Sequence, residues 1–366
     1  MTSVGAASLD LPEDLLALAT ALVAMASPSH HEQVIAEAVE AALAACDHLA
    51  VERVGDNVVA RTSLGRPRRL LLVGHLDTVP PSGGNDVPTV SDDVLTGVGA
   101  ADMKGGVAVL LALARAVREP AVDLTWCFYV CEEVARVHSG LGALLRERPE
   151  LLRADAAVVG EPTGGVVEAG CQGTLRVRLG LAGARAHTAR PYTGRNAVHR
   201  LAPVLAALAA YEGRTVVLDG CAYAEQLQAV AVDGGVAGNV VPDRASITVN
   251  HRFAPDRSAE EAEAALRELL APHLEPGDEW VLEDAAAGAH PRLDHPLLAR
   301  LVAATGAPPR AKVGWTDVAT LAEHGVPATN FGPGDPELAH TEGERVARAD
   351  LELAFDVLSA VVGSAD

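Results

Sequence analysis

The chain contains the segment WCFYVCEE at residues 126–133, in which six apolar residues run directly into the adjacent carboxylates Glu132 and Glu133. Such a run is typical of a buried β-strand, and α/β sheets carry their chemistry at the carboxyl ends of their strands. Two adjacent acids repel each other and are costly to place near a core unless a cation compensates them. The segment therefore predicts an α/β sheet with a metal site, and the alternative is a solvated glutamate pair that opens a loop.

Two further apolar runs end on side chains that can bind a metal. Residues 70–74 form the first run, and His75 and Asp77 follow it on one side of the chain, because alternate residues of a strand share a face. Residues 156–160 form the second run, which ends at Glu161 before a proline that needs no hydrogen-bond donor. Because the pattern recurs, the metal site is favoured over the solvated pair.

Two more candidate ligands lie in loops. Residues 326–331 predict a weaker strand, and the Gly-Pro loop after it leads to His340. Asp102 lies in a glycine-rich loop directly before the helical stretch 107–117. The candidate ligands therefore come from five separate parts of the chain: His75, Asp102, Glu133, Glu161 and His340.

The ligand types indicate which metal would bind. Imidazole with carboxylates suits zinc, and also cobalt or manganese, while the shortage of thiolates argues against a purely structural zinc site. Two ions fit better than one, because a bridging carboxylate leaves each ion a histidine, a terminal carboxylate and room for a shared water. Asp102 is the natural bridge, since its loop lies between the others. Glu132 is then left over as the general base.

Five motifs, spread in order over nearly the whole chain, resemble the co-catalytic zinc aminoacylase and carboxypeptidase family. They are HLDTVP at residues 75–80, GAADMKG at 99–105, EE at 132–133, GEP at 160–162 and the distant His340. The resemblance implies an amide hydrolase that uses two Zn²⁺ ions per subunit, with Co²⁺ or Mn²⁺ as substitutes, and an acylated amino acid as its small-molecule substrate.

The resemblance also implies a role for each of these residues. His75, Asp102 and Glu161 would bind one zinc ion. The second ion would be bound by Asp102 together with Glu133 and His340. In relatives, the position of Glu132 holds the general base, and the position of Asp77 holds the partner that orients the histidine ligand.

After residue 173 the pattern changes to alternation of apolar and polar residues, as in an antiparallel sheet with one face in water. The expected elements are strands at 174–181, 227–232, 245–253 and 280–283, and helices at 196–211 and 258–270. Ser258 and Glu261 form a capping box at the start of the second helix. Strand, helix, two strands, helix and strand describe an α/β open-faced sandwich.

The expected fold class is α/β, with a zinc-peptidase-like catalytic domain whose mixed central sheet is flanked by helices. A chain of 366 residues is long for one core, which favours two domains. In the family that the chain resembles, an inserted open-faced sandwich carries the dimer contact. We therefore expect a catalytic domain at 1–173 and 285–366, a lid and dimerisation domain at 174–284, and a homodimer.

Three residues of the insert match functional positions of the family. His187 resembles the histidine that reaches the active site, often from the partner subunit, and stabilises the oxyanion of the tetrahedral intermediate. Asn239 in the string GNVVPD and Arg252 in the string NHRF match positions that contact substrate carboxylates. The alternative for Asn239 is that its segment is only a turn.

Segments 164–174, 312–319 and 330–334 most resemble the actinobacterial branch of the succinyl-diaminopimelate desuccinylases. This implies hydrolysis of N-succinyl-LL-2,6-diaminopimelate to succinate and LL-2,6-diaminopimelate, in lysine and diaminopimelate biosynthesis. Thr316, in the second segment, is expected to contact the substrate. The alternatives are an acetylornithine deacetylase, an aminoacylase or a dipeptidase, and, more distantly, a non-catalytic metal-binding scaffold.

The pocket departs from the proteobacterial branch of these enzymes at two places. Cys171 and Gln172 stand where that branch has two arginines, and Arg190 stands where it has a tyrosine. Compared with the proteobacterial branch, this chain therefore lacks arginine at one side of the expected substrate pocket and has an additional arginine at another. We infer as a hypothesis that recognition of a substrate carboxylate has moved to Arg190.

The composition of the chain indicates which classes of binding partner and which cellular compartment to expect. The net charge of −20 argues against nucleic acid, because phosphate-binding proteins normally present a basic surface. No hydrophobic stretch reaches membrane-spanning length, and residues 1–10 lack the basic start and apolar centre of a signal peptide. Five cysteines without framework spacing are expected to be reduced and mainly buried, which predicts a cytoplasmic protein.

Overall fold

The computed structural model describes residues 9, 11 and 13–363. The chain forms two compact units: Met1–Ala169 with Pro291–Arg310 and Thr320–Asp366, and Gly170–His290 with Ala311–Ala319. Most of residues 1–10, on which the absence of a signal peptide was predicted, lie outside the described residues. The lid and dimerisation role, with its expected limits of 174 and 284, stays a prediction.

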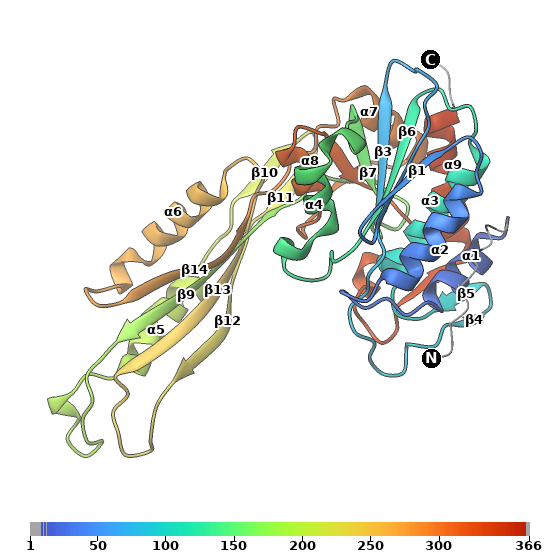
Figure 1. Ribbon diagram of the computed structural model, residues 1–366. Helices are drawn as coiled ribbons and strands as arrows, with labels where there is room; N and C mark the ends of the chain where they lie inside the picture. The colour runs from blue at the N-terminus through green and yellow to red at the C-terminus, as the bar shows by residue number, and fades with distance from the viewer. Residues whose placement is uncertain (1–8, 10, 12, 364–366) are drawn as a thin grey trace. The chain divides into compact units, whose positions relative to one another are not determined.

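The first unit is built on a mixed eight-stranded sheet with the order β1-β2-β6-β3-β7-β16-β8-β15 (Figure 1). Its strands are β1 Ala50–Val54, β2 Asn57–Arg61, β3 Arg69–His75, β6 Asp123–Tyr129, β7 Ala156–Val159, β8 Glu168–Ala169, β15 Arg310–Ala311 and β16 Ala328–Asn330. The central strand β3 runs parallel to both β6 and β7, and β16 runs parallel to β7. The expected α/β fold with a mixed central sheet is confirmed.

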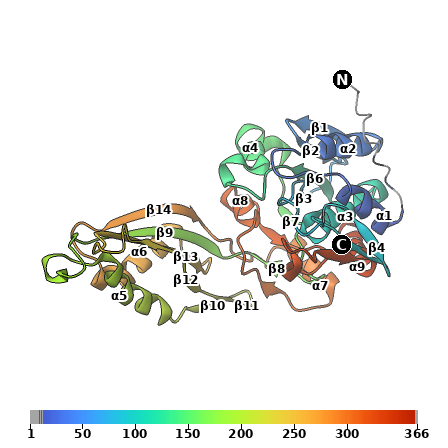
Figure 2. The same cartoon turned by 90° about the horizontal axis from the view of Figure 1, so that it is seen from below.

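Helices flank this sheet, with α1, α3 and α9 on one side and α4 on the other (Figures 1 and 2). The helices of this part are α1 Leu15–Val23, α2 Gln33–Ala44, α3 Gly105–Ala116, α4 Gly140–Glu147, α7 Pro296–Thr305, α8 Val318–Glu323 and α9 Arg348–Gly363. A Cβ atom at Gly106 in α3 would lie 2.1 Å from the carbonyl oxygen of Gly160. The glycine therefore allows the start of α3 to lie against the chain directly after β7.

The carboxyl end of β6 differs from the expectation. The strand ends at Tyr129, two residues before the predicted end, and Cys131 has a positive φ of 59°. A positive φ is uncommon for a residue with a side chain, so the backbone leaves the sheet through a tight turn. Glu132 and Glu133 therefore follow a turn, not the strand itself.

A small antiparallel sheet connects two distant loops of the first unit. Its strands, in spatial order, are β17 Arg345–Ala347, β5 Val94–Thr96 and β4 Thr89–Ser91. The N–H of Gly97 also donates to the carbonyl oxygen of Glu344 at 3.0 Å. These bonds hold the segment before Asp102 beside the segment that follows His340.

The second unit contains an antiparallel sheet with the order β12-β13-β9-β14 and two helices. Its elements are β9 Gly173–Ala182, α5 Ala197–Ala209, β10 Thr215–Leu218, β11 Cys221–Ala224, β12 Gln226–Gly234, β13 Arg244–Phe253, α6 Ala259–Leu270 and β14 Glu279–Ala286. The open-faced sandwich and the capping box of Ser258 and Glu261 are confirmed. The β10–β11 hairpin was not predicted.

One face of this sheet forms the core of the second unit. Alternate residues of β9 and β13, such as Val177 and Ile247, are fully buried against α5 and α6. The other face is polar, and on it Arg176 and Arg178 form ion pairs with Asp284 and Glu283 at 3.5 and 3.1 Å. Apolar packing against the two helices therefore stabilises one face of the sheet, and the other face presents charged side chains.

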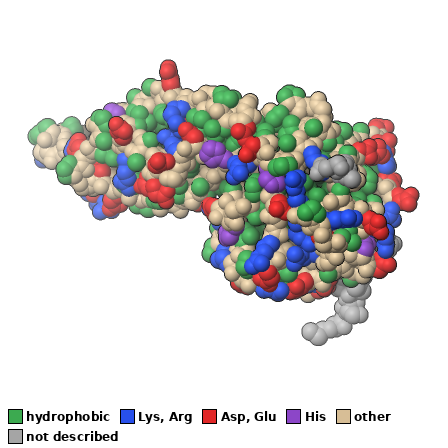
Figure 3. Space-filling view, turned by 90° about the horizontal axis from the view of Figure 1, so that it is seen from above, with side chains coloured by type: hydrophobic (Ala, Val, Ile, Leu, Met, Phe, Trp, Pro, Cys, Tyr) green, Lys and Arg blue, Asp and Glu red, His purple; other side chains and the backbone are tan. Residues whose placement is uncertain are grey.

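Other expectations from composition can be compared with the structure. All five cysteines lie among the described residues, where they are buried and form no disulfide. Among the described residues, no helix combines the length and the apolar character needed to cross a membrane. Figure 3 shows acidic and basic side chains mixed over the face that it draws, whereas phosphate binding requires a concentration of Lys and Arg.

Candidate metal centre

Two parallel strands bring the first two candidate ligands to one edge of the sheet. His75 is the last residue of β3, and Glu161 lies two residues beyond the end of β7. The register pairs Val73 with Val159, so the two side chains are equally far along neighbouring strands. His75 is fully buried and Glu161 is 6% exposed. An acid with so little exposure needs compensation by a positive charge or by hydrogen bonds.

Four of the five candidate ligands form a continuous cluster. A ring nitrogen of His75 and carboxylate oxygens of Asp102 and Glu133 lie within 4.8 Å of one another. Asp102 contacts a histidine through each oxygen, with Oδ1 at 3.1 Å from Nε2 of His75 and Oδ2 at 3.5 Å from Nε2 of His340. His340 Nε2 also lies 2.9 Å from Oε1 of Glu133. Asp102 is thus placed between the two imidazoles, as a bridging ligand would be.

The electrostatics of this cluster show a demand for positive charge. Hydrogen bonds with Asp102 and Glu133 raise the pKa of His340 to about 10. Burial lowers the pKa of His75, but its contacts with Asp102 and Asp77 more than reverse this and hold the pKa well above its ordinary value. A divalent cation would supply the same charge. Imidazole nitrogens and carboxylate oxygens at these distances fit zinc, cobalt or manganese.

Asp77 connects the histidine to the glutamate pair. Nδ1 of His75 lies 3.0 Å from the backbone oxygen of Asp77 and 3.6 Å from its carboxylate. The two carboxylate oxygens instead accept the backbone N–H groups of Glu132 and Glu133, each at 3.0 Å. Burial raises the pKa of Asp77, but His75 and these N–H groups lower it to about 2. Asp77 is therefore an anion that fixes the turn carrying both glutamates.

In the second unit, three predicted site residues lie together. Nδ1 of His187 accepts the backbone N–H of Ala189 at 3.0 Å, and the carbonyl oxygen of Asn239 accepts the N–H of Thr188 at 3.1 Å. Arg190 donates its backbone N–H to the carbonyl oxygen of His187 at 2.7 Å. All three side chains are exposed. The bonds tie the His187 loop to the segment that leads into β13.

The structure separates Arg252 from these three residues. The His187 loop lies beside the start of β13, where the N–H of Gly183 bonds to the carbonyl oxygen of Asp243 at 2.8 Å. Arg252 lies near the other end of this strand, opposite Thr174. The eight residue steps of strand from Arg244 to Arg252 span about 27 Å. The two groups of predicted substrate contacts are therefore at opposite ends of the same sheet.

Thr316 lies in the segment Ala311–Ala319, which clusters with the second unit. It is 4% exposed, and its backbone oxygen accepts bonds from the N–H of Ala319 at 2.9 Å and from Cys171 Sγ at 3.8 Å. This loop is thereby fixed to the first residues of the insert. A role for Thr316 in substrate contact stays a prediction.

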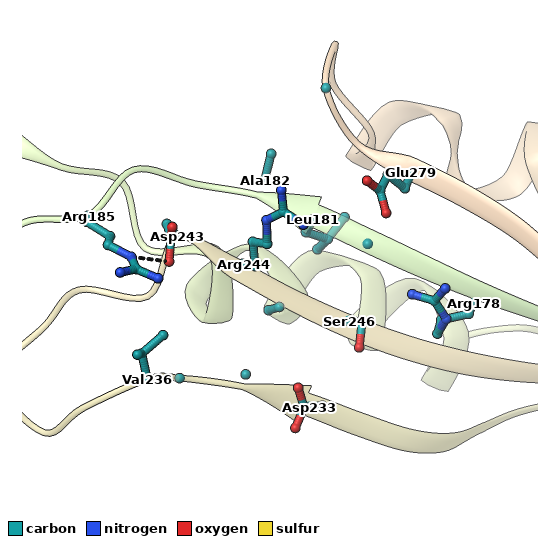
Figure 4. A pocket seen from close by; sticks show the side chains of 15 residues that line it. Arg178, Leu181, Ala182, Arg185, Asp233, Val236, Asp243, Arg244, Ser246 and Glu279 are labelled. Carbon is teal, nitrogen blue, oxygen red and sulfur yellow. Dashed lines mark ion pairs between the residues drawn. The ribbon is translucent and has the colours of Figure 1, made fainter.

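The open face of the inserted sheet also contains a cavity of about 320 Å³. Figure 4 shows its lining side chains, among them Arg178, Arg244 and Ser246 from neighbouring strands. Arg185 and Asp243 close one side with an ion pair at 2.9 Å. None of the twelve predicted site residues lines this cavity, although its lining residue Arg185 lies two positions before His187.

Comparison with known proteins places the chain in a family. Residues 71–364 match the peptidase family M20/M25/M40. The chain belongs to this family. The match covers every candidate metal ligand, and it confirms the resemblance on which the assignment of the motifs was based. M20 peptidases are metal-dependent hydrolases, in agreement with the cluster of histidines and carboxylates.

Two relatives of the M20 family match over almost their whole length. A Mycobacterium tuberculosis protein with the provisional name succinyl-diaminopimelate desuccinylase DapE is 50% identical over 97% of this chain and 99% of its own. A succinyl-diaminopimelate desuccinylase of Corynebacterium glutamicum is 44% identical over 92% of this chain and 93% of its own.

Solved structures share the fold of this chain. The aminopeptidase PepT of Bacillus cereus has a TM-score of 0.79 at 19% identity, with 96% of this chain and 97% of that chain covered. The YxeP protein of Bacillus subtilis, described as a dinuclear metal-binding peptidase of the M20 family, has a TM-score of 0.68 at 15% identity, with coverage of 95% and 96%. These similarities show the fold of the chain.

Sequence reasoning missed several residues that support the centre. Ser29 donates its hydroxyl to Oδ2 of Asp77 at 2.7 Å, and the buried Lys104 donates to the carbonyl oxygen of Met25 at 2.7 Å. The third is Glu344, a buried acid that bonds to the Asp102 loop. No spacing distinguishes Glu344 from the exposed Glu342 two residues earlier, so the sequence carries no signal for it.

Proposed function

We propose that this M20 protein hydrolyses N-succinyl-LL-2,6-diaminopimelate to succinate and LL-2,6-diaminopimelate. The observation that carries the proposal is the similarity over nearly the full length to the Mycobacterium and Corynebacterium proteins that bear the name of this activity. The substrate is an acylated amino acid, and its amide bond suits a metal-dependent hydrolase. The complete set of candidate ligands, with Glu132 beside them, speaks against a non-catalytic scaffold.

We propose further that five residues hold two zinc ions, with cobalt or manganese as substitutes. His75, Asp102 and Glu161 would bind one ion. Asp102 would bridge to the second ion, held by Glu133 and His340. The contacts of both Asp102 oxygens with different histidines support this bridging role. Two such ions would lower the pKa of a water molecule and polarise the acyl carbonyl.

Glu132 is the general base of the proposed reaction. Asp77 holds its backbone N–H at 3.0 Å, which fixes the start of the side chain beside the cluster. In this position the carboxylate would take a proton from the attacking water and return it to the leaving amine. Glu133, held by the other oxygen of Asp77, would remain a ligand. Asp77 thus keeps two adjacent acids in two different roles.

His187 is proposed to donate a hydrogen bond to the oxyanion of the tetrahedral intermediate. Because its Nδ1 accepts the N–H of Ala189, a neutral imidazole carries its proton on Nε2. That nitrogen is then a donor, as stabilisation of a developing oxyanion requires. The exposure of the side chain leaves it available to a second molecule.

The position of His187 favours action across a homodimer. The chain enters and leaves the insert near Gly173 and Ala286, the end of the sheet that holds Arg252. His187 lies at the opposite end, about 27 Å further along the strands. Because Arg252 and His187 lie at opposite ends of one sheet, we propose that they serve the centres of different subunits, with His187 acting on the centre of the partner subunit.

A mixed dimer tests this division. One subunit would carry H187A and the other E132Q, with two affinity tags to purify the mixed species. If His187 acts across the dimer, one of the two centres is intact, and the mixed dimer should recover about half of the wild-type turnover. Both parent homodimers, measured in parallel, should be strongly impaired. A mixed dimer as inactive as its parents would show that His187 acts within its own subunit.

Substrate carboxylates would be bound by Arg252, Arg190 and Asn239. Among the described residues, the guanidinium of Arg252 has no hydrogen-bond or ion-pair partner, and burial lowers its pKa although the charge of Asp284 acts to raise it. A guanidinium in this state is well suited to a carboxylate ligand, which it can bind through two hydrogen bonds. Arg190, at the His187 end of the sheet, would recognise the second carboxylate of a bound substrate.

A substrate panel distinguishes the proposed activity from its alternatives. Purified, metal-loaded protein would be offered N-succinyl-LL-2,6-diaminopimelate, N-acetylornithine, other acylated amino acids and dipeptides, and the released amine identified. We expect kcat/KM for the succinyl substrate to exceed the others by at least about a hundredfold, because an unpaired arginine discriminates against substrates without its carboxylate. Faster release of ornithine, or of an amino acid from a dipeptide, would refute the desuccinylase assignment.

A further inference from the structure

Glu344 lies in the loop after His340 and reaches into the other ligand loop. It is 1% exposed, and its Oε1 accepts two backbone N–H groups, from Ala101 at 3.0 Å and from Asp102 at 2.9 Å. The residues that it joins are 242 and 243 positions away in the sequence. A buried carboxylate with two such bonds is a fixed part of the structure, not a solvated loop side chain.

The bonds of Glu344 come at a point where the backbone is irregular. Asp102 has φ −115° and ψ 95°, which is outside the helical range of the short turn Ala100–Lys104 that contains it. Because Asp102 also lies in the first turn, its N–H needs an acceptor from outside, and Glu344 supplies that acceptor. Since the backbone of Asp102 is held, both of its oxygens remain directed at the two histidines.

Glu344 also couples the loops of two candidate ligands. Its carbonyl oxygen accepts the N–H of Gly97, and its N–H donates to the carbonyl oxygen of Thr341 at 3.2 Å, directly after His340. Asn85 adds a third connection, since its Nδ2 donates to Thr341 at 3.4 Å and its carbonyl oxygen accepts the N–H of Val98 at 2.8 Å. The loops of Asp102 and His340 are thereby tied into one piece.

We propose that Glu344 is a positioning residue that sets the spacing between Asp102 and His340, and through it the affinity of the centre for metal. The hydrogen bonds of Glu344 are similar to those of Asp77, whose carboxylate accepts the N–H groups of Glu132 and Glu133. Two buried acids thus hold the two irregular turns that carry ligands. The inference rests on the metal centre described under the proposed function.

Three variants distinguish the effect of side-chain length from the effect of charge at position 344. Glu344→Gln keeps an oxygen at the same distance but removes the charge, Glu344→Asp keeps the charge but shortens the reach, and Glu344→Ala removes both. Glu342→Ala, in the same loop but exposed, is the matched control. If spacing is what matters, the glutamine variant should resemble the wild type and the aspartate variant should be impaired.

The readout is binding of Zn²⁺ or Co²⁺ alone, by calorimetry and by the visible spectrum of bound Co²⁺, with the melting temperature of each metal-free variant as a check on folding. We expect Glu344→Ala and Glu344→Asp to bind metal about 10- to 100-fold more weakly, the usual loss when a group that orients a ligand is changed. Glu344→Gln and Glu342→Ala should bind nearly as the wild type does.

Two results would overturn the positioning role: wild-type affinity in both Glu344→Ala and Glu344→Asp, or impaired binding in Glu344→Gln with normal binding in Glu344→Asp. The test needs no substrate. A wild-type protein that binds metal but hydrolyses nothing would refute the proposed function and leave this inference standing. A wild-type protein that binds no metal would overturn the centre itself, and this role with it.

Discussion

Replacing Glu132 by glutamine should lower kcat about a thousandfold while both metal ions stay bound. A positioned general base contributes about 10²–10⁴ to the rate, and glutamine has the size of glutamate but cannot accept the proton. The backbone N–H of residue 132 would still bond to Asp77, because that contact does not involve the side chain. Steady-state kinetics and metal analysis on the same preparation measure the two quantities.

The neighbouring residue provides the matched control for this experiment. Glu133→Gln changes the same chemical group one position further, but Glu133 contacts His340 at 2.9 Å and is a proposed ligand. We expect this variant to lose metal as well as activity. Near wild-type turnover in Glu132→Gln would contradict the base assignment, and metal loss in Glu132→Gln would make Glu132 a ligand.

Removal of the metal ions should lower turnover at least about a thousandfold. Metal ions at such centres supply several kcal/mol of transition-state stabilisation, and each 1.4 kcal/mol corresponds to a factor of ten. Added Zn²⁺ or Co²⁺ should restore the rate. Metal at about a thousand times its dissociation constant should also raise the free energy of unfolding by about 4 kcal/mol.

Dialysis against a chelator, followed by assays before and after metal is returned, checks this expectation. Mg²⁺ is a suitable negative control, because it prefers oxygen ligands in octahedral geometry and the cluster offers two imidazoles. Full activity in protein shown by elemental analysis to be free of metal would contradict the account. Recovery with Mg²⁺ alone would contradict the proposed role of the histidines.

The main sheet could be predicted because it follows from local pattern, and residue type was enough to select four candidate ligands that lie in one cluster: His75, Asp102, Glu133 and His340. Apolar runs that end on His75 and Glu161 become neighbouring parallel strands, and equal register brings such ends to one edge. The turn at Cys131 could not be predicted, since a positive φ at a residue other than glycine has no reliable sequence signal.

Residues that act through the backbone were harder to find. The carboxylate of Asp77 was expected to orient His75, and its bonds to two N–H groups 55 and 56 residues away depend on the turn geometry. Glu344 depends in the same way on the pairing of β17 with β5. Such partners are fixed by tertiary structure, whereas the ligands themselves are recognisable by residue type.

The insert shows a second limit of sequence reasoning. Asn239 and Arg252 are only 13 positions apart, and both were assigned to substrate carboxylates. The ten-residue strand β13 begins after Asn239 and contains Arg252 near its end, so the two residues occupy opposite ends of a sheet. Each residue was assigned by resemblance to a position in relatives, and the resemblance carried no information on the length of strand that separates the two.

Anomalous diffraction from crystals of the zinc-loaded protein, collected at the zinc absorption edge, tests the central claim most directly. The account predicts two peaks per subunit, each about 2.0–2.2 Å from its ligand atoms, with Asp102 contacting both. Their other ligands should be His75, Glu161, Glu133 and His340, and Glu132 should contact neither ion. A single peak, peaks away from these residues, or an ion bound by Glu132 would contradict the account.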